Sequence, residues 1–260
     1  MDQSEIDKIA GQLEIARKGA KPIGKLSKAF PGMTVHDAYA IQREIIRQRM
    51  GDGAKVIGRK VGLTSKAAQQ MLKVDQPDFG VLLSDMSYPT TSAIPRASLI
   101  APKAEGEIAF LLKRDLHGPR VTTAEVLAAT EGVMACFEIV DSRIENWDIT
   151  LVDTVADNAS SGLIVMGDRL VDPSRIDLAM AGMVLEKNGE VVLTGAGAAA
   201  LGSPVNAVAW LASALFEFGE GLSAGEVILS GSLAAMVPVN AGDQLRMAID
   251  GIGACSVRFV

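Results

Sequence analysis

The chain has 260 residues and a formal net charge of -6 at pH 7, a length that suits one large domain or one domain with a small appendage. Hydrophobic residues make up 48% of the chain and aromatic residues only 4%, so the core is expected to be mostly aliphatic. The mild acidity, and the lack of a block of lysines and arginines, argue against a nucleic-acid-binding surface.

The N-terminal sequence MDQSEIDKIAGQ is acidic and polar, unlike a secretory signal. No apolar run is expected to approach the roughly twenty residues that span a bilayer. Cys136 and Cys255 are the only cysteines and both lie in apolar runs, which favours buried free thiols. These features predict a cytoplasmic protein without membrane contacts.

The N-terminal residues predict a small helical lobe. Ser4-Glu5-Ile6-Asp7 resembles a capping box, and apolar residues follow it at helical spacing. A linker rich in Gly, Lys and Pro runs to about Pro31, and Thr34-Val35-His36-Asp37 opens a second helix. We therefore expect a helical lobe over 1–52 and a second, larger domain over 53–260.

The larger domain carries many strand-like runs with few helices between them, which indicates a mixed sheet and not regular βαβ repetition. Strand-like runs are expected at 56–62, 106–113, 133–140, 162–166, 183–186, 190–194, 226–230, 244–249 and 254–260. Helical runs are expected at 64–73, 122–131 and 204–218. The predicted fold class is α/β of the α+β kind.

Glutamates are embedded in two of these apolar strands. Glu105 and Glu107 occur in AEGEIAF, and Glu138 occurs in MACFEIV. Alternate residues of a strand share a face, so Glu105 and Glu107 would repel each other there, and burying them unpaired would be costly. A divalent cation such as Mg²⁺ would remove the repulsion, because hard cations take oxygen ligands. The pattern alone leaves a solvated sheet face as the alternative.

Three further positions are candidates for chemistry. The polar stretch VDTVADNASSG (152–162) is either a capped turn or a substrate-facing loop that offers the hydroxyls of Ser160 and Ser161. Lys60, in VIGRKVG, is either solvated or a base or proton shuttle whose pKa a nearby metal site would lower. Asp78 follows Pro77, a pairing that commonly forms a turn, and is the third candidate.

Residues 190–200, EVVLTGAGAAA, match a strand followed by G-x-G-x-x-A, the dinucleotide fingerprint. Gly202 and Pro204 follow at once, so the helix is expected to start near Ser203, too late for the motif. The next strand ends in Ser230-Gly231-Ser232 without an acid to hold a ribose. Nucleotide binding is therefore disfavoured.

Six segments together resemble the 2-keto-4-pentenoate hydratase family, which belongs to the fumarylacetoacetate hydrolase superfamily and includes the 4-oxalocrotonate decarboxylases. The segments cover nearly the whole chain in order, at 58–86, 102–116, 138–147, 152–162, 202–212 and 228–243. The resemblance implies a mixed β-sheet roll of the fumarylacetoacetate hydrolase C-terminal type with a small N-terminal helical lobe. It also implies a homo-oligomer, and it leaves open whether a decarboxylase or aldolase of the same pathway associates with it.

The resemblance also implies roles for individual residues. Glu105, Glu107 and Glu138 would be the ligands of Mg²⁺ or Mn²⁺. Lys60 and Asp78 would be acid/base groups. Ser160, followed by Ser161 in the same loop, would lie beside a small 2-oxo or 2-hydroxy-dienoate substrate.

The reaction implied is the metal-dependent addition of water to 2-hydroxypenta-2,4-dienoate (2-oxopent-4-enoate) in the meta-cleavage degradation of aromatic compounds. The product would be 4-hydroxy-2-oxopentanoate. Asp78 and the 152–162 stretch look like the hydratase form, whereas 184–190 and 195–202 look more like the decarboxylases. Decarboxylation of 4-oxalocrotonate is therefore the alternative. A non-catalytic subunit would have lost a ligand or Lys60, and this chain keeps them all.

Overall fold

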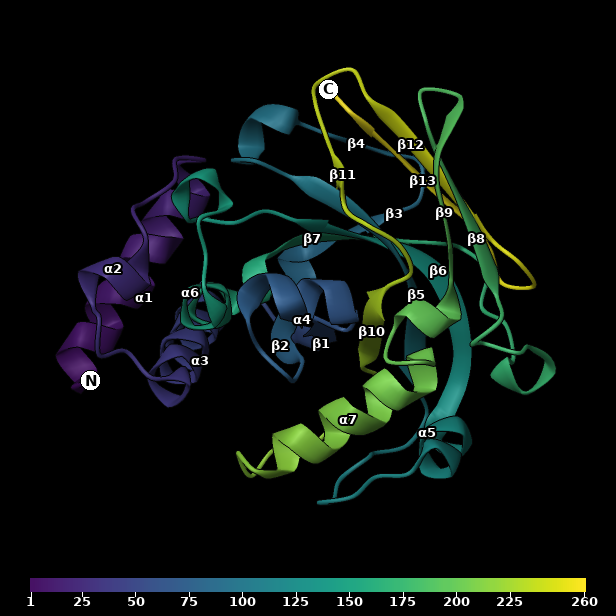
Figure 1. The fold of residues 1–260 in the computed structure, drawn as a ribbon, viewed down its shortest axis with the longest axis horizontal. Helices are drawn as coiled ribbons and strands as arrows, with labels where there is room; N and C mark the ends of the chain where they lie inside the picture. Colours follow the sequence, from purple (N-terminus) through teal and green to yellow (C-terminus); the bar gives the residue numbers. More distant parts are fainter.

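The computed structural model describes residues 1–260. It contains two β-sheets, with the N-terminal helices gathered to one side of them (Figure 1). The helices are α1 (Gln3–Lys18), α2 (Leu26–Ala29), α3 (Val35–Gly51), α4 (Lys66–Leu72), α5 (Thr123–Ala129), α6 (Leu151–Ala156) and α7 (Pro204–Phe216).

The larger sheet has eight strands in the order β2-β1-β10-β5-β6-β7-β3, with β11 also paired to β5. Its strands are β1 (Val56–Gly62), β2 (Asp78–Leu83), β3 (Ser87–Pro89), β5 (Lys103–Leu112), β6 (Thr130–Val140), β7 (Ser161–Met166), β10 (Val227–Ser232) and β11 (Val237–Pro238). The pairs β1–β10 and β3–β7 are parallel and the others antiparallel. The sheet is therefore mixed, as the sequence predicts.

The smaller sheet has five strands in the order β4-β13-β12-β8-β9. They are β4 (Ser92–Ile94), β8 (Gly182–Lys187), β9 (Glu190–Ala196), β12 (Gln244–Ile249) and β13 (Gly253–Phe259). This sheet packs against one face of the larger one. A Cβ at Gly106 of β5 would lie 2.4 Å from the Met183 sulfur and 2.5 Å from the Met247 sulfur, so only glycine allows this approach.

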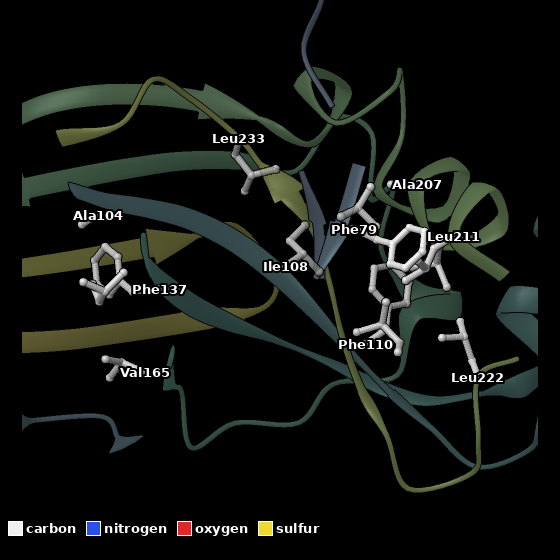
Figure 2. Close-up of a cluster of buried hydrophobic side chains, with 14 of the residues drawn as sticks. Phe79, Ala104, Ile108, Phe110, Phe137, Val165, Ala207, Leu211, Leu222 and Leu233 are labelled. Carbon is white, nitrogen blue, oxygen red and sulfur yellow. The ribbon is translucent and has the colours of Figure 1, made fainter. Parts of the chain in front are cut away.

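The two faces of β5 have different roles because side chains alternate along a strand. Ala104, Ile108 and Phe110 belong to the main hydrophobic core. Figure 2 shows Phe137 and Val165 in one part of that core, and Phe110 with Leu211 of α7 in another part of it. The side chains that alternate with these core residues along β5 point to the opposite face of the sheet. They are those of Lys103, Glu105 and Glu107.

The start of α1 differs from its prediction, whereas the start of α3 agrees. The N-cap of α1 is Asp2, whose carboxylate accepts a hydrogen bond from the Glu5 backbone N–H at 2.9 Å. The predicted box at Ser4 is therefore two residues too late, because an aspartate is as good a cap as a serine. Thr34 and Asp37 form the predicted box at α3.

One apolar stretch, which includes α7, is longer than the sequence analysis expected. The stretch Gly197–Phe216 is long and apolar enough to cross a bilayer by length and composition, although no such run was expected. In the structure α7 is a core helix, with Ala207, Val208 and Leu211 fully buried. Its apolar composition is explained by packing against the sheet.

The lobe boundary at residue 52 stays a prediction, and one hydrophobic core joins α1 and α3 to the sheets.

Candidate active site

Three carboxylates meet on the larger sheet. Glu105 of β5 is paired in register with Glu138 of β6, and Glu107 is paired with Cys136. Register pairs share a face, as do alternate residues of one strand, so the three side chains converge. One carboxylate oxygen from each lies within 4.8 Å of those of the other two. The pattern read from the sequence therefore corresponds to one cluster.

The cluster is buried and short of hydrogen-bond donors. Glu107 and Glu138 are fully buried, whereas Glu105 keeps some exposure. Glu107 Oε2 accepts a hydrogen bond from the Gly231 backbone N–H at 2.8 Å. Glu107 Oε1 and both oxygens of Glu138 have no hydrogen-bond partner. Buried unpartnered carboxylate oxygens are costly, and a hard divalent cation is the ligand that suits such a donor set. The three residues therefore fit Mg²⁺ or Mn²⁺.

The electrostatics of the cluster favour a cation as well. Burial, followed by repulsion from Glu138, raises the pKa of Glu105 to about 7. The same two causes raise the pKa of Glu107 well above its ordinary value, although the Gly231 N–H opposes the shift. Carboxyl groups that resist ionisation in this way would release protons on binding a metal ion.

Lys60 and Asp78 face the same site from β1 and β2. Lys60 Nζ lies 3.4 Å from Glu138 Oε1. A Cβ at Gly62 would lie 2.1 Å from Asp78 Oδ1 and 3.3 Å from Lys60 Nζ, so both side chains lie beside this glycine. Burial raises the pKa of Asp78, and Lys60 opposes that shift only in part.

The lowered pKa expected for Lys60 beside a bound metal ion stays a prediction, and the carboxylates alone act in the opposite direction. Burial alone would lower the pKa of its ammonium group, but the negative charges of Glu138 and Asp78 outweigh burial and raise it. The sequence pattern indicated the carboxylates of the cluster but did not indicate that Glu138 and Asp78 would both act on this lysine.

Ser160 is placed by a short segment in which three consecutive residues, Asn158, Ala159 and Ser160, have positive φ angles. This conformation is strained for residues other than glycine. Asn158 holds it by accepting a hydrogen bond from the Val81 N–H at 2.8 Å and donating one to the Val81 carbonyl at 2.9 Å. The predicted loop over 152–162 is therefore only partly present: α6, which the sequence did not predict, takes up residues 152–156, and β7 begins at Ser161.

The candidate residues border a cavity of about 300 Å³. Lys60, Asp78, Glu105 and Ser160 line it, together with apolar side chains. The Ser160 hydroxyl lies 3.2 Å from the hydroxyl of Thr154, which also lines the cavity. Glu107 and Glu138 do not line the cavity themselves, but their carboxylates lie close to that of Glu105, which does. Ser161 is buried at the start of β7 and does not line the cavity.

Sequence reasoning missed three polar groups of this cavity, Lys103, Trp147 and Asp148. Lys103 stands two residues before Glu105, so strand alternation could have placed both on one face. Trp147 and Asp148 come from a turn after β6, and no motif in the sequence indicates that this turn reaches the cavity. The Trp147 indole N–H donates a hydrogen bond to the Ala101 carbonyl at 2.9 Å.

Comparison with known proteins shows the family to which the chain belongs. The fumarylacetoacetate hydrolase C-terminal family matches residues 55–260. The 2-hydroxyhexa-2,4-dienoate hydratase of Comamonas testosteroni is 51% identical, covering 99% of this chain and 98% of the relative. The 2-keto-4-pentenoate hydratase of Paraburkholderia xenovorans is 48% identical, covering 100% and 96%.

A solved structure is similar over the full length. The 4-oxalocrotonate decarboxylase of Pseudomonas putida G7, complexed with magnesium and adipate, superposes with a TM-score of 0.98 at 40% identity, covering 100% of this chain and 99% of that one. The fold class expected from the resemblance is confirmed. The chain therefore belongs to the fumarylacetoacetate hydrolase family, alongside 2-keto-4-pentenoate hydratases that are about half identical to it over nearly their full length.

Proposed function

We propose that this protein is a metal-dependent hydratase that adds water to 2-hydroxypenta-2,4-dienoate and yields 4-hydroxy-2-oxopentanoate. One observation carries the proposal: three carboxylates within 4.8 Å of one another lie beside a cavity that Lys60 and Asp78 also line. The identity of about one half to full-length hydratases supports the same reaction. Such a reaction belongs to the meta-cleavage degradation of aromatic compounds.

The ligand set proposed for Mg²⁺ or Mn²⁺ is Glu105, Glu107 and Glu138. When bound there, the ion would supply a Lewis acid that polarises the 2-oxygen of the substrate. Two of the glutamates are fully buried, so their carboxylates are held by packing and cannot turn to solvent. Glu105, which lines the cavity, is the ligand nearest to the substrate.

Proton transfers are assigned to Lys60 and Asp78. Lys60, whose ammonium group lies 3.4 Å from Glu138 Oε1, can deliver a proton to C5 of the dienol while the 2-hydroxyl proton passes to Asp78, on the other side of Gly62. A carboxylate and an ammonium group in one buried site can pass that proton back from Asp78 to Lys60 and restore the starting state. In the second half, Asp78 can take a proton from the water that adds at C4 while Lys60 gives a proton to C3, and the same return of the proton completes the cycle.

Ser160 and Thr154 are assigned to the substrate's polar groups, since both line the cavity and their hydroxyls already contact each other. The strained segment around Ser160 fixes the direction of its side chain. Ser161 is proposed as a neighbour that supports this segment, because its hydroxyl is buried and unpartnered.

Decarboxylation of 4-oxalocrotonate is the second candidate, because the superposition on that enzyme is nearly complete. Both reactions place negative charge on the 2-oxygen of the substrate, so a metal ion held by the carboxylate cluster would assist either one. The hydratase is favoured because identity to the hydratases, at 48–51%, exceeds the 40% identity to the decarboxylase. The protein is further proposed to act in the cytoplasm as a homo-oligomer, and its association with a pathway decarboxylase or aldolase stays a prediction.

The test is to offer fresh 2-hydroxypenta-2,4-dienoate to chelator-stripped protein with and without Mg²⁺ or Mn²⁺. Loss of dienoate absorbance and appearance of 4-hydroxy-2-oxopentanoate are measured. Metal-dependent product is the expected result. No product from the dienoate, together with CO₂ release from 4-oxalocrotonate, would replace the hydratase by the decarboxylase.

A further inference from the structure

Lys103 is a cation of the cavity that has no partner in the protein. It lies on the same face of β5 as Glu105, and it lines the cavity. Lys60 and Lys103 are the only cations among the lining residues. Lys60 is paired with Glu138 at 3.4 Å, whereas Lys103 has no carboxylate within 4.0 Å and its ammonium group makes no hydrogen bond to the protein.

The ammonium group of Lys103 is held in position by an aromatic ring. Its Nζ lies 4.2 Å from the ring centroid of Trp147, a geometry at which a cation is attracted to the ring face. The indole N–H of Trp147 is bonded to the Ala101 carbonyl at 2.9 Å, which anchors the ring. A ring satisfies a cation only in part, so the hydrogen-bond donors of the ammonium group remain free for a ligand.

The charge balance of the cavity calls for such a cation. Three glutamates with a divalent ion leave a net charge of about -1, and a substrate carboxylate would add another negative charge. Asp148, next to Trp147 in the chain, also lines the cavity, but its carboxylate is already paired with the Lys25 ammonium group at 2.6 Å. Lys103 is therefore the group that can offset the incoming carboxylate.

We propose that Lys103, supported by Trp147, binds the carboxylate next to the 2-oxygen of the substrate and makes the site selective for 2-oxo and 2-hydroxy acids over their neutral analogues. The inference rests on the proposed function, because a 2-hydroxydienoate carries one charged group and that group is this carboxylate. Charge-assisted hydrogen bonds are about twice as strong as neutral ones, so a single lysine can supply this selectivity.

The test is calorimetric and needs no turnover. Mg²⁺-loaded protein is titrated with 2-oxopentanoate, with its neutral amide and with 2-oxoadipate. In Lys103→Met the affinity for 2-oxopentanoate and for 2-oxoadipate should fall about ten- to a hundredfold, while the affinity for the amide stays unchanged. Lys103→Arg should recover most of the loss, because it restores the cation. Lys113→Met, which removes an exposed lysine beyond the far end of β5, should behave as the wild type.

Three outcomes would overturn the proposal. Equal loss for the acid and the amide would mean that Lys103 only shapes the cavity. Loss confined to 2-oxoadipate would mean that it binds a distal carboxylate. Weaker Mn²⁺ binding in Lys103→Met would mean that it acts through Glu105.

The proposed function can fail separately. A wild type that binds 2-oxo acids through Lys103 but hydrates no dienoate would retain this inference and reject the hydratase. If the wild type hydrates the dienoate and Lys103→Met binds 2-oxo acids as tightly as the wild type, the hydratase is retained and this inference is rejected.

Discussion

Glu105 and Glu138 lie directly opposite each other in the antiparallel pair of β5 and β6. Like charges in this position destabilise a sheet, and here both oxygens of Glu138 also lack a hydrogen-bond partner. The pair is therefore unfavourable for the stability of the metal-free protein and favourable for binding a cation, and these two effects can be separated by experiment.

Glu107→Gln should change metal affinity and metal-free stability in opposite directions. The amide can still accept the hydrogen bond from the Gly231 N–H, but it removes a negative charge from the cluster. Metal-stripped protein should therefore melt at a higher temperature, while Mn²⁺ affinity and turnover fall by at least the ten- to hundredfold that an outer-shell change costs. Calorimetric titration and thermal unfolding measure both. Glu131→Gln, on the exposed part of β6, is the control, and full activity of Glu107→Gln at low metal would exclude Glu107 as a ligand.

The stability of the metal-free protein should fall as the pH rises from about 4.5 to about 7. The pKa of Glu105 is raised from 4.5 to about 7 in the folded chain, so in this range the folded state holds a proton that the unfolded state has lost. Stability falls with pH wherever the unfolded state binds fewer protons. Urea unfolding at pH 5 and pH 7.5 measures the difference.

Saturating Mg²⁺ should abolish this decline, since a bound cation replaces the proton, and Mg²⁺ affinity should rise over the same pH range. Glu105→Gln should flatten the metal-free profile. Asp157, whose pKa burial raises to about 6, contributes in the same direction and is unaffected by the substitution. A Glu105→Gln profile as steep as that of the wild type would assign the effect to the other buried carboxyl groups whose pKa is raised, which are Glu107, Asp78 and Asp157.

Local patterns in the sequence predict much of this site. Alternation along β5 correctly places Glu105 and Glu107 on one face, and α7 begins at Pro204 with Ser203 as its N-cap, as expected from the glycine and proline that precede it. The register of β5 against β6, which joins Glu138 to the other two, depends on pairing between strands far apart in sequence. A single sequence does not encode that register locally.

Other features escaped prediction for similar reasons. The turn that Pro77-Asp78 offers as the alternative reading is absent, because Asp78 begins β2 and pairs with Gly62. Helix α6 is only six residues long, too short for its periodicity to show. Lys103 and Trp147 meet only because the turn after β6 folds back onto β5.

Lys60→Met should abolish most of the turnover without weakening metal binding. A positioned general acid contributes about 10²–10⁴-fold to the rate, so a loss of that size is expected in kcat. Removing a positive charge 3.4 Å from Glu138 should, if anything, strengthen Mn²⁺ binding. Steady-state kinetics and Mn²⁺ titration of the same preparation measure the two. A parallel loss of both would show that Lys60 supports the ligand cluster and not proton transfer.

Gly62→Ala tests the placement of Asp78 relative to Lys60 without removing either group. The new Cβ would lie 2.1 Å from Asp78 Oδ1, so the carboxylate must move away from the lysine. We expect kcat to fall, Mn²⁺ affinity to hold and the free energy of unfolding to drop by about 1–3 kcal/mol, as overpacking does. Gly11→Ala is the matched control: a Cβ there meets nothing within 4 Å in α1, and alanine should stabilise the helix by about 0.5–1 kcal/mol. Unchanged kcat in Gly62→Ala would mean that hydration does not need Asp78 at this distance from Lys60, and another group of the cavity would then have to take the proton from the water.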